Sequence, residues 1–399
     1  MTVVIPTATH AMVGGPKKQL TVLGGMYTRE MANRFANLQL LMPTIRQIAH
    51  DLNVSVSTVS AVINNSGYVS AQLRARIQKA LRETNYRPNP IARSLRLRET
   101  RTIGLIVPDL ANSFYSRLMR GAEDYLQGTA YRLLGADSRE DWKRQYDYLA
   151  SFSGRATDGI ILVPCMATSD QIASIPSIVR ETPLVYVDRS PVECAVDSVL
   201  VDNARASQEA TRHLLELGHQ RIGIITEPLN LLNAAERLTG YKQALESSHV
   251  PVDRELICTG DNTEDSGYWR GLDLLQMADP PTAVFVCNNL MTLGVLTALR
   301  ELKVACPRDI SLVGFDDFEW CPYLEPPLTM VRQPASELGA AAAKAILKRV
   351  RHPDQNHTDR VLLPTQLIVR KSTAAPNHAA RMQHDVTRQA NEEPKALSS

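Results

Sequence analysis

Short side chains between positions 55 and 61 of this 399-residue chain could read a nucleic acid. Ser55 precedes a helical pattern as an N-cap, and Val56, Ser57, Ser60 and Ala61 share the exposed face of that helix. Another helical pattern comes just before it, across a tight turn, and two helices at this spacing form a helix-turn-helix. The second helix of that motif is sized to enter the major groove of DNA, so sequence recognition is the chemistry expected here.

Three helical patterns supply the apolar core that must hold this face in place. Thr44 caps the first helix, and Asn53 lies at the turn, because asparagine tolerates the left-handed conformation. Ser70 caps the third helix. The inward-facing residues are expected to be Ile45, Ile48, Ala49, Leu52, Val59, Val62, Ile63, Leu73, Ile77, Ala80 and Leu81. We therefore expect a helix-turn-helix headpiece over residues 43–90.

The headpiece and the segment after it carry a strong positive charge. Residues 43–101 hold ten basic and three acidic side chains, a net charge of +7, which leaves −5 for the rest of a chain whose total is +2. This distribution is typical of a nucleic-acid module fused to another domain. Asn89-Pro90 opens a short basic helical pattern, predicted as a hinge helix over 91–101, with Leu95 as its prominent apolar side chain. From the residues alone, a charged linker helix is the simpler explanation of this pattern.

The chain after position 101 alternates short apolar strands with amphipathic helices. Strands are expected at 102–108, 131–137, 158–164, 184–188, 198–203, 221–226, 283–288, 310–317 and 367–370, with helices at 113–125, 204–217, 234–247, 290–302 and 335–350. Strands that are apolar throughout indicate parallel sheets buried on both faces, and their number fits two sheets. We expect a ligand-binding α/β domain over residues 102–372.

Composition and targeting signals narrow the class of protein further. The six cysteines are scattered and form no C-x-x-C pair, so we expect reduced thiols and neither a metal nor another cofactor. No apolar run is long enough to cross a bilayer and no secretory signal is present, which indicates a cytoplasmic protein. Residues 1–42 are expected to be disordered or untranslated, with a regulatory tail as the alternative, and residues 373–399 to be a disordered tail.

The sequence resembles the LacI/GalR family of bacterial repressors. The resemblance rests on V-S-x-x-T-V-S from Val54 and N-Y-x-P-N-x-x-A-R-S-L from Asn85, and it continues to about Ser372 through DGIILVP, HLLELGHQRIGIIT, ISLVGFDD and LLPTQLIVRKS. It implies an all-α helix-turn-helix headpiece plus an α/β periplasmic-binding-protein-like sensor of two parallel-sheet subdomains. It also implies a homodimer that reads a near-palindromic, double-stranded DNA operator.

The resemblance also implies roles for the DNA-facing residues. Val56 and Ser57 open the recognition helix and face base edges, and Leu95 wedges into the minor groove and kinks the duplex. The positions that mainly contact phosphates are matched by Ser55, Thr58, Ser60, Asn64 and Ser70, and Asn89 belongs to the matched hinge motif. At Ala61 the family commonly has arginine, which reads guanine with two hydrogen bonds. Alanine cannot do so, and the operator should therefore differ at that base or depend more on DNA shape.

The family fold places its ligand in a cleft between two subdomains, joined by three chain crossings that we expect near 202–203, 332–333 and 352. Residues just after strands are candidates on physical grounds too, because ligands of open α/β sheets lie beyond the carboxyl ends of strands. The candidate effector-binding residues are Asn112, Phe114, Tyr115, Asp188, Arg237, Asn262 and Asn289. Phe114 and Tyr115 could stack on a ring, and Arg237 matches an arginine that donates paired hydrogen bonds to ligand oxygens. Taken singly, Arg237 also fits a surface charge, and Asp188 and Asn289 fit loop caps.

Two of these positions depart from the family pattern. Asn262 lies where an aromatic ring often stacks on the ligand, and Asn289 replaces the usual aspartate. Aspartate accepts from two neighbouring hydroxyls, whereas asparagine offers one acceptor and one donor. The effector is expected to be a sugar or sugar derivative, and Asn289 suggests the hypothesis of a sugar acid or a phosphorylated sugar.

These patterns together predict an effector-controlled repressor of carbohydrate-utilisation genes, with a corepressor-dependent or activating regulator as the alternative. A solute-binding protein is disfavoured by the basic headpiece. An enzyme is disfavoured because the sequence holds no Walker loop, G-x-S-x-G, H-E-x-x-H or G-x-G-x-x-G after a strand, and because His213 and His219 have no third ligand nearby. The C-terminal tail lacks the family's leucine heptads, so we expect a dimer rather than a tetramer.

Overall fold

The computed structural model describes residues 44–86, 99–192, 195–353 and 357–377. The chain divides into two compact units, Met1–Leu97 and Arg98–Ser399. Residues 1–42 and 378–399, together with Asn89 and Leu95, lie outside the described residues, so the expectations for them stay predictions. Within the described ranges, no helix is long and apolar enough to cross a membrane.

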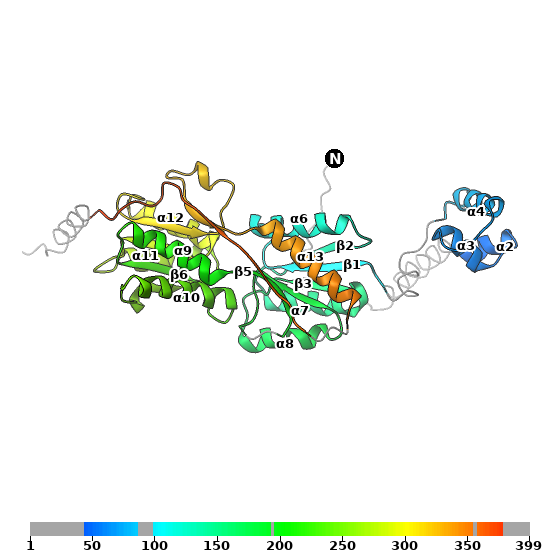
Figure 1. Cartoon of the computed structure of the whole chain (residues 1–399), viewed down its shortest axis with the longest axis horizontal. Coiled ribbons are helices and arrows are strands. Elements are labelled where there is room, and N and C mark those ends of the chain that lie inside the picture. Colours follow the sequence, from blue (N-terminus) through cyan, green and yellow to red (C-terminus); the bar gives the residue numbers. More distant parts are fainter. Residues whose placement is uncertain (1–43, 87–98, 193–194, 354–356, 378–399) are drawn as a thin grey trace, which may run out of the picture. The chain divides into compact units, whose positions relative to one another are not determined.

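The described part of the first unit, residues 44–86, folds into three short helices (Figure 1). The helices are α2 Ile45–Asp51, α3 Val56–Ile63 and α4 Ala71–Glu83. Their core is built from Ile48, Ala49, Val59, Val62 and Ile77, all of which the sequence pattern selected. Asn53 has a φ of +53°, which confirms the left-handed turn predicted between α2 and α3.

The second unit begins with a six-stranded parallel sheet, sheet 1, in the order β11-β5-β4-β3-β1-β2. The strands are β1 Thr102–Val107, β2 Arg132–Asp137, β3 Gly159–Leu162, β4 Leu184–Val187, β5 Asp197–Val201 and β11 Arg360–Leu363. Helices α6 Ser113–Gln127 and α13 Ala335–Arg351 pack on one face, and α7 Trp142–Ser151 and α8 Ser169–Val179 on the other. The central strands are buried on both faces, and this explains their continuous apolar runs.

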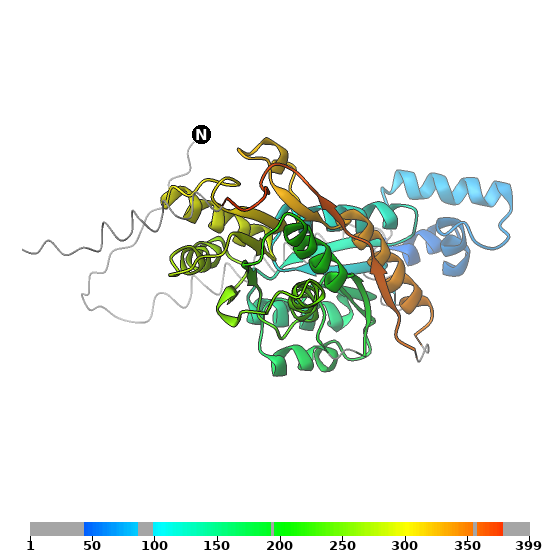
Figure 2. The same ribbon diagram turned by 60° about the vertical axis from the view of Figure 1, so that its left-hand side comes forward.

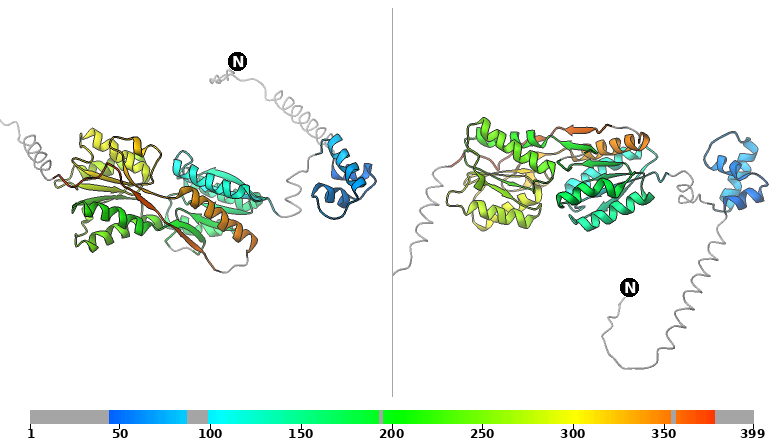
Figure 3. Two further views of the ribbon diagram at one scale, coloured as in Figure 1. Left: turned by 45° about the horizontal axis from the view of Figure 1, so that its top comes forward. Right: turned by 90° about the horizontal axis from the view of Figure 1, so that it is seen from below.

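Sheet 2 repeats this three-layer plan in the order β12-β10-β9-β8-β6-β7 (Figure 3). Its strands are β6 Ile222–Thr226, β7 Ile257–Thr259, β8 Ala283–Val286, β9 Ser311–Phe315, β10 Thr329–Arg332 and β12 Gln366–Ile368. Helices α9 Asn203–Glu216 and α10 Leu232–Ser247 cover one face, and α11 Glu264–Leu275 and α12 Asn289–Glu301 the other. Only β12 runs antiparallel to its neighbour, β10, among these paired strands.

The chain passes between the two subdomains after β5, after β10, and between β11 and β12 (Figure 2). The expectation of a third crossing near His352 is wrong. Helix α13 packs on sheet 1 along its length and β11 then pairs with β5, so the crossing falls at Pro364-Thr365. The sequence pattern missed it because β11 is a short edge strand whose residues are mostly exposed.

Two of the expected boundaries are wrong, at residues 99–101 for the hinge helix and at residues 373–374 for the C-terminal tail. Residues 99–101 are not helical but run directly into β1. Residues 373 and 374 belong to the folded domain, because the Ala374 carbonyl accepts a hydrogen bond from His219 Nε2 at 2.9 Å and Thr373 bonds His213 at 3.0 Å. His219 also lies 2.9 Å from the Thr282 hydroxyl, and burial lowers its pKa, so both histidines serve the fold.

Helices α6 and α13 approach each other closely because glycine lies at their contact. A methyl group at Gly121 would lie 1.9 Å from the carbonyl oxygen of Ser336, and one at Gly339 would lie 1.9 Å from that of Leu118. Any larger residue at either position would force the two helices apart. This close packing fixes the start of α13, and therefore Gln333, relative to the start of α6.

Candidate functional site

The recognition face of the headpiece is organised by its N-cap. Ser55 Oγ accepts a hydrogen bond from the Thr58 backbone N–H at 3.1 Å and lies 2.7 Å from the hydroxyls of both Ser57 and Thr58. Three hydroxyls therefore gather at the N-terminus of α3, where backbone N–H groups also point outward and favour phosphate oxygens. This arrangement is what a helix end that approaches a DNA backbone requires.

The exposed surface of α3 carries the other residues selected from the sequence. Val56 is 41% exposed and Ser57 is exposed, whereas Ser60 and Ala61 are half-buried. The Asn64 amide donates to the Ser60 carbonyl at 2.9 Å and lies 3.1 Å from the Ser60 hydroxyl. Ser70 caps α4 by accepting from the Leu73 N–H at 3.4 Å. The roles of these residues at DNA stay predictions.

In the second unit, two buried carboxylates meet across the subdomain boundary. Asp188 follows β4 of sheet 1 and Asp316 follows β9 of sheet 2, and the Gln333 amide nitrogen donates to both, at 3.4 and 2.6 Å respectively. Gln333 lies directly after β10, on the second crossing. Burial raises the pKa of Asp188 to about 7, and Asp316 adds to the rise while Arg189 opposes it. Burial also raises the pKa of Asp316.

Arg237 lies at the centre of the polar cluster on the sheet 2 side. Its guanidinium donates to Asn203 Oδ1 at 2.9 Å, to Glu227 Oε2 at 3.2 Å and to the Cys287 carbonyl at 2.6 Å. The guanidinium also lies 3.7 Å from the centroid of the Phe315 ring, a cation–π contact. Burial would lower the pKa of Arg237, but Glu227 and Asp316 outweigh it and the pKa is raised. Arg237 is therefore a fixed, charged donor rather than a surface side chain.

A second arginine extends the cluster to the sheet 1 side. Arg189 Nη1 donates to Glu140 Oε1 at 2.8 Å and to the Pro164 carbonyl at 3.2 Å, and its side chain is only 4% exposed. In the amide orientation that satisfies both of its ends, Asn262 accepts from Arg189 at 3.2 Å and donates to Glu227 at 3.0 Å. Asn262 thus joins the two subdomains through side-chain hydrogen bonds.

The amides of Asn112 and Asn289 form a direct, reciprocal pair between the subdomains. Asn112 Nδ2 donates to Asn289 Oδ1 at 3.1 Å, and Asn289 Nδ2 donates to Asn112 Oδ1 at 2.9 Å. The same oxygens accept from the N–H groups of Phe114 and Leu290 at the starts of α6 and α12. An aspartate at position 289 could accept but not donate, so this departure from the family pattern creates the pair.

Two aromatic candidates lie at the start of α6, and both are buried. Phe114 and Tyr115 are 3% and 5% exposed, and their rings meet edge to face at 5.1 Å within the core of sheet 1. The Arg189 guanidinium lies 6.0 Å from the Tyr115 ring centroid. Tyr115 therefore borders the polar cluster, and Phe114 is held mainly as a core residue.

The cluster contains residues that the sequence analysis did not select. Glu140, Arg189, Asn203, Glu227, Asp316 and Gln333 all contribute hydrogen bonds to it. Glu227 and Asp316 lie immediately beyond the ends of β6 and β9, so the rule that selected Asp188 would also have found them. Gln333 lies directly after β10, a strand that the sequence analysis did not predict. Asp188, Asn262 and Asp316 have φ values of +66°, +67° and +73°, a left-handed conformation that is uncommon for residues other than glycine and is often concentrated at functional sites.

Some polar atoms of the cluster have no hydrogen-bond partner among the described residues. These are Gln333 Oε1 and the Oδ1 of Asn233, whose Nδ2 donates to Glu227 Oε2 at 3.5 Å, and both atoms are buried. A buried polar atom without a partner costs free energy that a polar ligand can recover. Donors and acceptors from two subdomains thus gather at the carboxyl ends of parallel strands, the position at which ligands of open α/β sheets bind.

Comparisons with known proteins agree with this architecture. Residues 44–89 match the bacterial regulatory proteins of the lacI family, and residues 211–373 match a periplasmic binding protein-like domain. The ribose operon repressor of Haemophilus influenzae is 36% identical over 324 residues, which cover 81% of this chain and 97% of the relative. The class of protein is thus a regulator with a DNA-binding headpiece and an α/β sensor.

Two solved structures of transcriptional regulators are also similar to this chain. The Lac repressor dimer bound to operator and the anti-inducer ONPF is 25% identical with a TM-score of 0.73, covering 84% of this chain and 99% of that one. A LacI family transcriptional regulator from Enterococcus faecium with bound ribose is 32% identical with a TM-score of 0.60, covering 69% and 100%. The chain belongs to the lacI family of bacterial regulatory proteins and is a DNA-binding transcriptional regulator.

Proposed function

We propose that this protein is a repressor that binds a near-palindromic operator as a homodimer in the cytoplasm and is controlled by a pentose, with ribose as the first candidate. The proposal rests on the polar cluster of Asp188, Arg189, Arg237, Asp316 and Gln333, whose buried side chains come from both subdomains and from the crossing between them. Relatives named for ribose support it: one is a ribose operon repressor and another holds bound ribose.

The chemistry of the cluster suits a compact polyol. A sugar hydroxyl both donates and accepts, so it can donate to Asp188 or Asp316 and accept from Arg189 or Arg237. Asn262 contributes an amide where the family often has an aromatic ring, and Tyr115 and Phe315 supply the nearby aromatic surface. Because the side chains of the cluster are buried, it favours a five- or six-carbon sugar over a long glycoside.

The hypothesis of a sugar acid or a sugar phosphate is disfavoured by the local charge. Glu140, Asp188, Glu227 and Asp316 face the guanidiniums of Arg189 and Arg237, so acids outnumber bases among the described groups of the cluster. Mutual repulsion among these acids contributes to the raised pKa values of Asp188 and Glu227. An anionic ligand would add to this repulsion, whereas a neutral sugar would not.

The second candidate function is regulation by a corepressor. The contacts between Asn112 and Asn289 and between Gln333 and both aspartates join the subdomains without a ligand, so an effector that strengthens a closed, DNA-binding form is also consistent with the geometry. We propose binding rather than catalysis at the cluster, because the relatives that this chain resembles are named as repressors and regulators.

The test is a titration of the full-length protein with ribose, glucose, ribose 5-phosphate and cellobiose by isothermal calorimetry. We expect ribose to bind most tightly and ribose 5-phosphate at least about ten-fold more weakly, because of the cluster's charge. Tight binding of the phosphate, with no heat from the neutral sugars, would overturn the pentose proposal. The sign of the effector follows from operator binding measured with and without the sugar that binds.

A further inference from the structure

A single carboxylate fixes the chain where it enters the second unit. Asp158 lies directly before β3, and its two oxygens accept three hydrogen bonds from the residues that precede β1. Asp158 Oδ1 accepts from the Thr100 N–H at 2.7 Å and the Thr100 hydroxyl at 2.8 Å, and Oδ2 accepts from the Arg101 N–H at 2.7 Å. These are short bonds to an ionised acceptor, the stronger kind of hydrogen bond in proteins.

The backbone around this carboxylate is fixed from other sides as well. The Asp158 N–H donates to the Thr102 carbonyl at 2.8 Å, and the Arg101 carbonyl accepts from the Arg132 N–H at 3.0 Å. Arg101 has a φ of +54°, a left-handed conformation that is unfavourable for arginine and persists only where the surroundings impose it. The chain is therefore bent at Arg101, and Asp158 holds the bend.

We infer that Asp158 is a positioning residue for operator binding: by fixing Thr100 and Arg101, it sets the direction in which the DNA-binding segment leaves the effector domain. The inference rests on the proposed function, since it assumes that the headpiece binds DNA. Asp158 lies at the other end of the strands from the polar cluster, and it acts only through the two residues that it holds. No role in ligand recognition follows from its contacts.

The physical consequence concerns chain entropy. Without the carboxylate, Thr100 and Arg101 lose their shared acceptor and regain backbone freedom that operator binding must then remove. Fixing the backbone of one residue reduces an equilibrium constant by about ten-fold. We therefore expect Asp158→Asn to weaken operator binding by at least about ten-fold, because an amide replaces one acceptor oxygen with a donor that faces an N–H.

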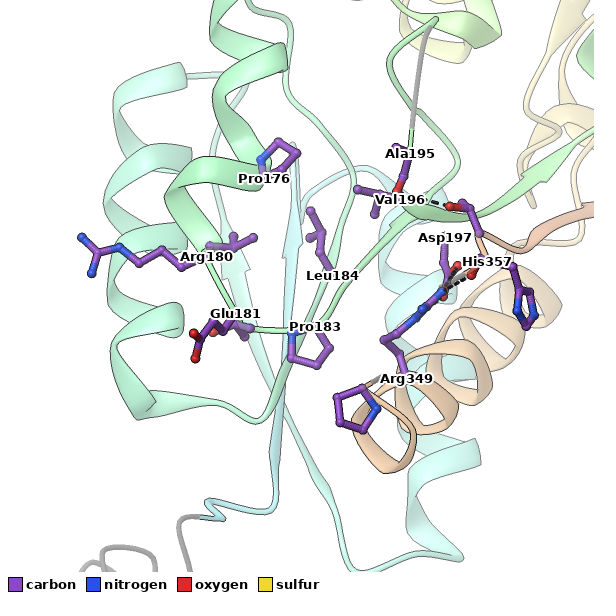
Figure 4. A pocket seen from close by; sticks show the side chains of 14 residues that line it. Pro176, Arg180, Glu181, Pro183, Leu184, Ala195, Val196, Asp197, Arg349 and His357 are labelled. Atoms are coloured by element: carbon purple, nitrogen blue, oxygen red, sulfur yellow. Dashed lines mark hydrogen bonds and ion pairs between the residues drawn. The ribbon is translucent and has the colours of Figure 1, made fainter. Parts of the chain in front are cut away.

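A matched control lies at the same end of the strands of sheet 1. Asp197 begins β5, and its carboxylate accepts from Arg349 Nε at 2.9 Å and from the Asp359 N–H at 2.8 Å, beside a hollow of about 300 Å³ (Figure 4). It accepts several hydrogen bonds as Asp158 does, but it joins β5 to α13 and β11 rather than to the residues before β1. Asp197→Asn should lower the melting temperature and leave operator affinity within about two-fold of wild type.

The experiment compares full-length wild type, Asp158→Asn, Asp197→Asn and the milder Thr100→Val, which removes one of the three bonds. Operator affinity is measured by fluorescence anisotropy at fixed salt, and ribose affinity by calorimetry. We expect operator affinity to fall at least about ten-fold in Asp158→Asn and about three-fold in Thr100→Val, with ribose affinity unchanged in all three variants, because the polar cluster lies at the opposite end of these strands.

Amide hydrogen exchange gives a readout that does not depend on DNA. The Thr100 and Arg101 amides should be protected in wild type and in Asp197→Asn and should exchange rapidly in Asp158→Asn. Wild-type operator affinity in Asp158→Asn, or equal losses in Asp158→Asn and Asp197→Asn, would overturn the inference. Absence of any operator binding by the wild-type protein would instead overturn the proposed function, and this inference with it.

Discussion

Replacing Asp188 by asparagine should stabilise the ligand-free protein at alkaline pH. Burial and the neighbouring Asp316 raise the pKa of Asp188 from an ordinary value of 3.8 to about 7. The folded state thus holds the proton more tightly than the unfolded state does, and the contribution of Asp188 to stability falls as the pH rises from about 4 to about 7. Above pH 7 the buried Asp188 carboxylate is ionised, and its destabilisation of the folded state has reached its full size.

The size of the effect follows from the shift. A change of about three pKa units corresponds to at most about 4 kcal/mol at pH 8, and at pH 5 less than half of this penalty applies. The asparagine side chain of the variant would carry no charge at either pH and could still accept from Gln333. Since about 1 kcal/mol moves the melting temperature of a domain of this size by about 2–4 °C, we expect a rise at least about 5 °C larger at pH 8 than at pH 5.

The assay is thermal unfolding of the ligand-free protein from pH 5 to pH 9, with Asp317→Asn as the contrasting variant. Asp317 is also buried, but hydrogen bonds from Arg370 and Arg332 lower its pKa, so its contribution is present at neutral pH and is lost as the pH falls. Asp317→Asn should therefore lower the melting temperature at pH 8. A loss of stability in Asp188→Asn at pH 8, or an equal change at both pH values, would refute the reasoning about Asp188.

Three further predictions concern the two sites. Asn289→Asp removes one of the two hydrogen bonds to Asn112, so the equilibrium between closed and open arrangements of the two subdomains should shift about five-fold toward the open one in the ligand-free protein. Small-angle scattering measures this shift, and an unchanged scattering profile would contradict the pairing. A lysine at position 237 cannot keep the hydrogen bonds to Asn203 and Glu227 at the same time. In Arg237→Lys, ribose binding measured by calorimetry should therefore be lost, and the free energy of unfolding measured by denaturation should fall by about 3 kcal/mol. Ala61→Arg should raise the affinity for half-sites with guanine at the matching base by at least about five-fold, measured by anisotropy on a set of operator variants. An equal rise in affinity for all sequences would indicate only attraction of the added positive charge to the phosphates.

Much of the fold follows from local patterns in the sequence. The headpiece core was predictable because Ile48, Val59 and Ile77 fall at helical spacing behind hydroxyl caps. The central strands were predictable because burial on both faces demands continuous apolar runs. The short strands β7, β10 and β11 were not, because three or four residues with polar or exposed members carry little apolar signal, and the third crossing was misplaced for that reason.

The candidate site was only partly predictable. Asp188, Arg237, Asn262 and Asn289 were selected from the sequence and lie at the subdomain boundary, but the partners that set their charge were not selected. Glu227 and Asp316 follow strands as Asp188 does, yet nothing in the sequence states that both lie near Arg237. That proximity arises from the arrangement of two subdomains, and so the excess of carboxylates that disfavours an anionic effector becomes visible only in three dimensions.

The most direct test of a sugar-controlled regulator is fluorescence anisotropy of full-length protein on its own upstream DNA at fixed salt, while ribose is titrated. We expect a clear preference over scrambled DNA and a shift of at least about ten-fold in operator affinity as ribose saturates, with no shift in Arg237→Lys. Equal affinity for operator and scrambled DNA would contradict the regulator, and specific binding that ribose leaves unchanged would contradict pentose control.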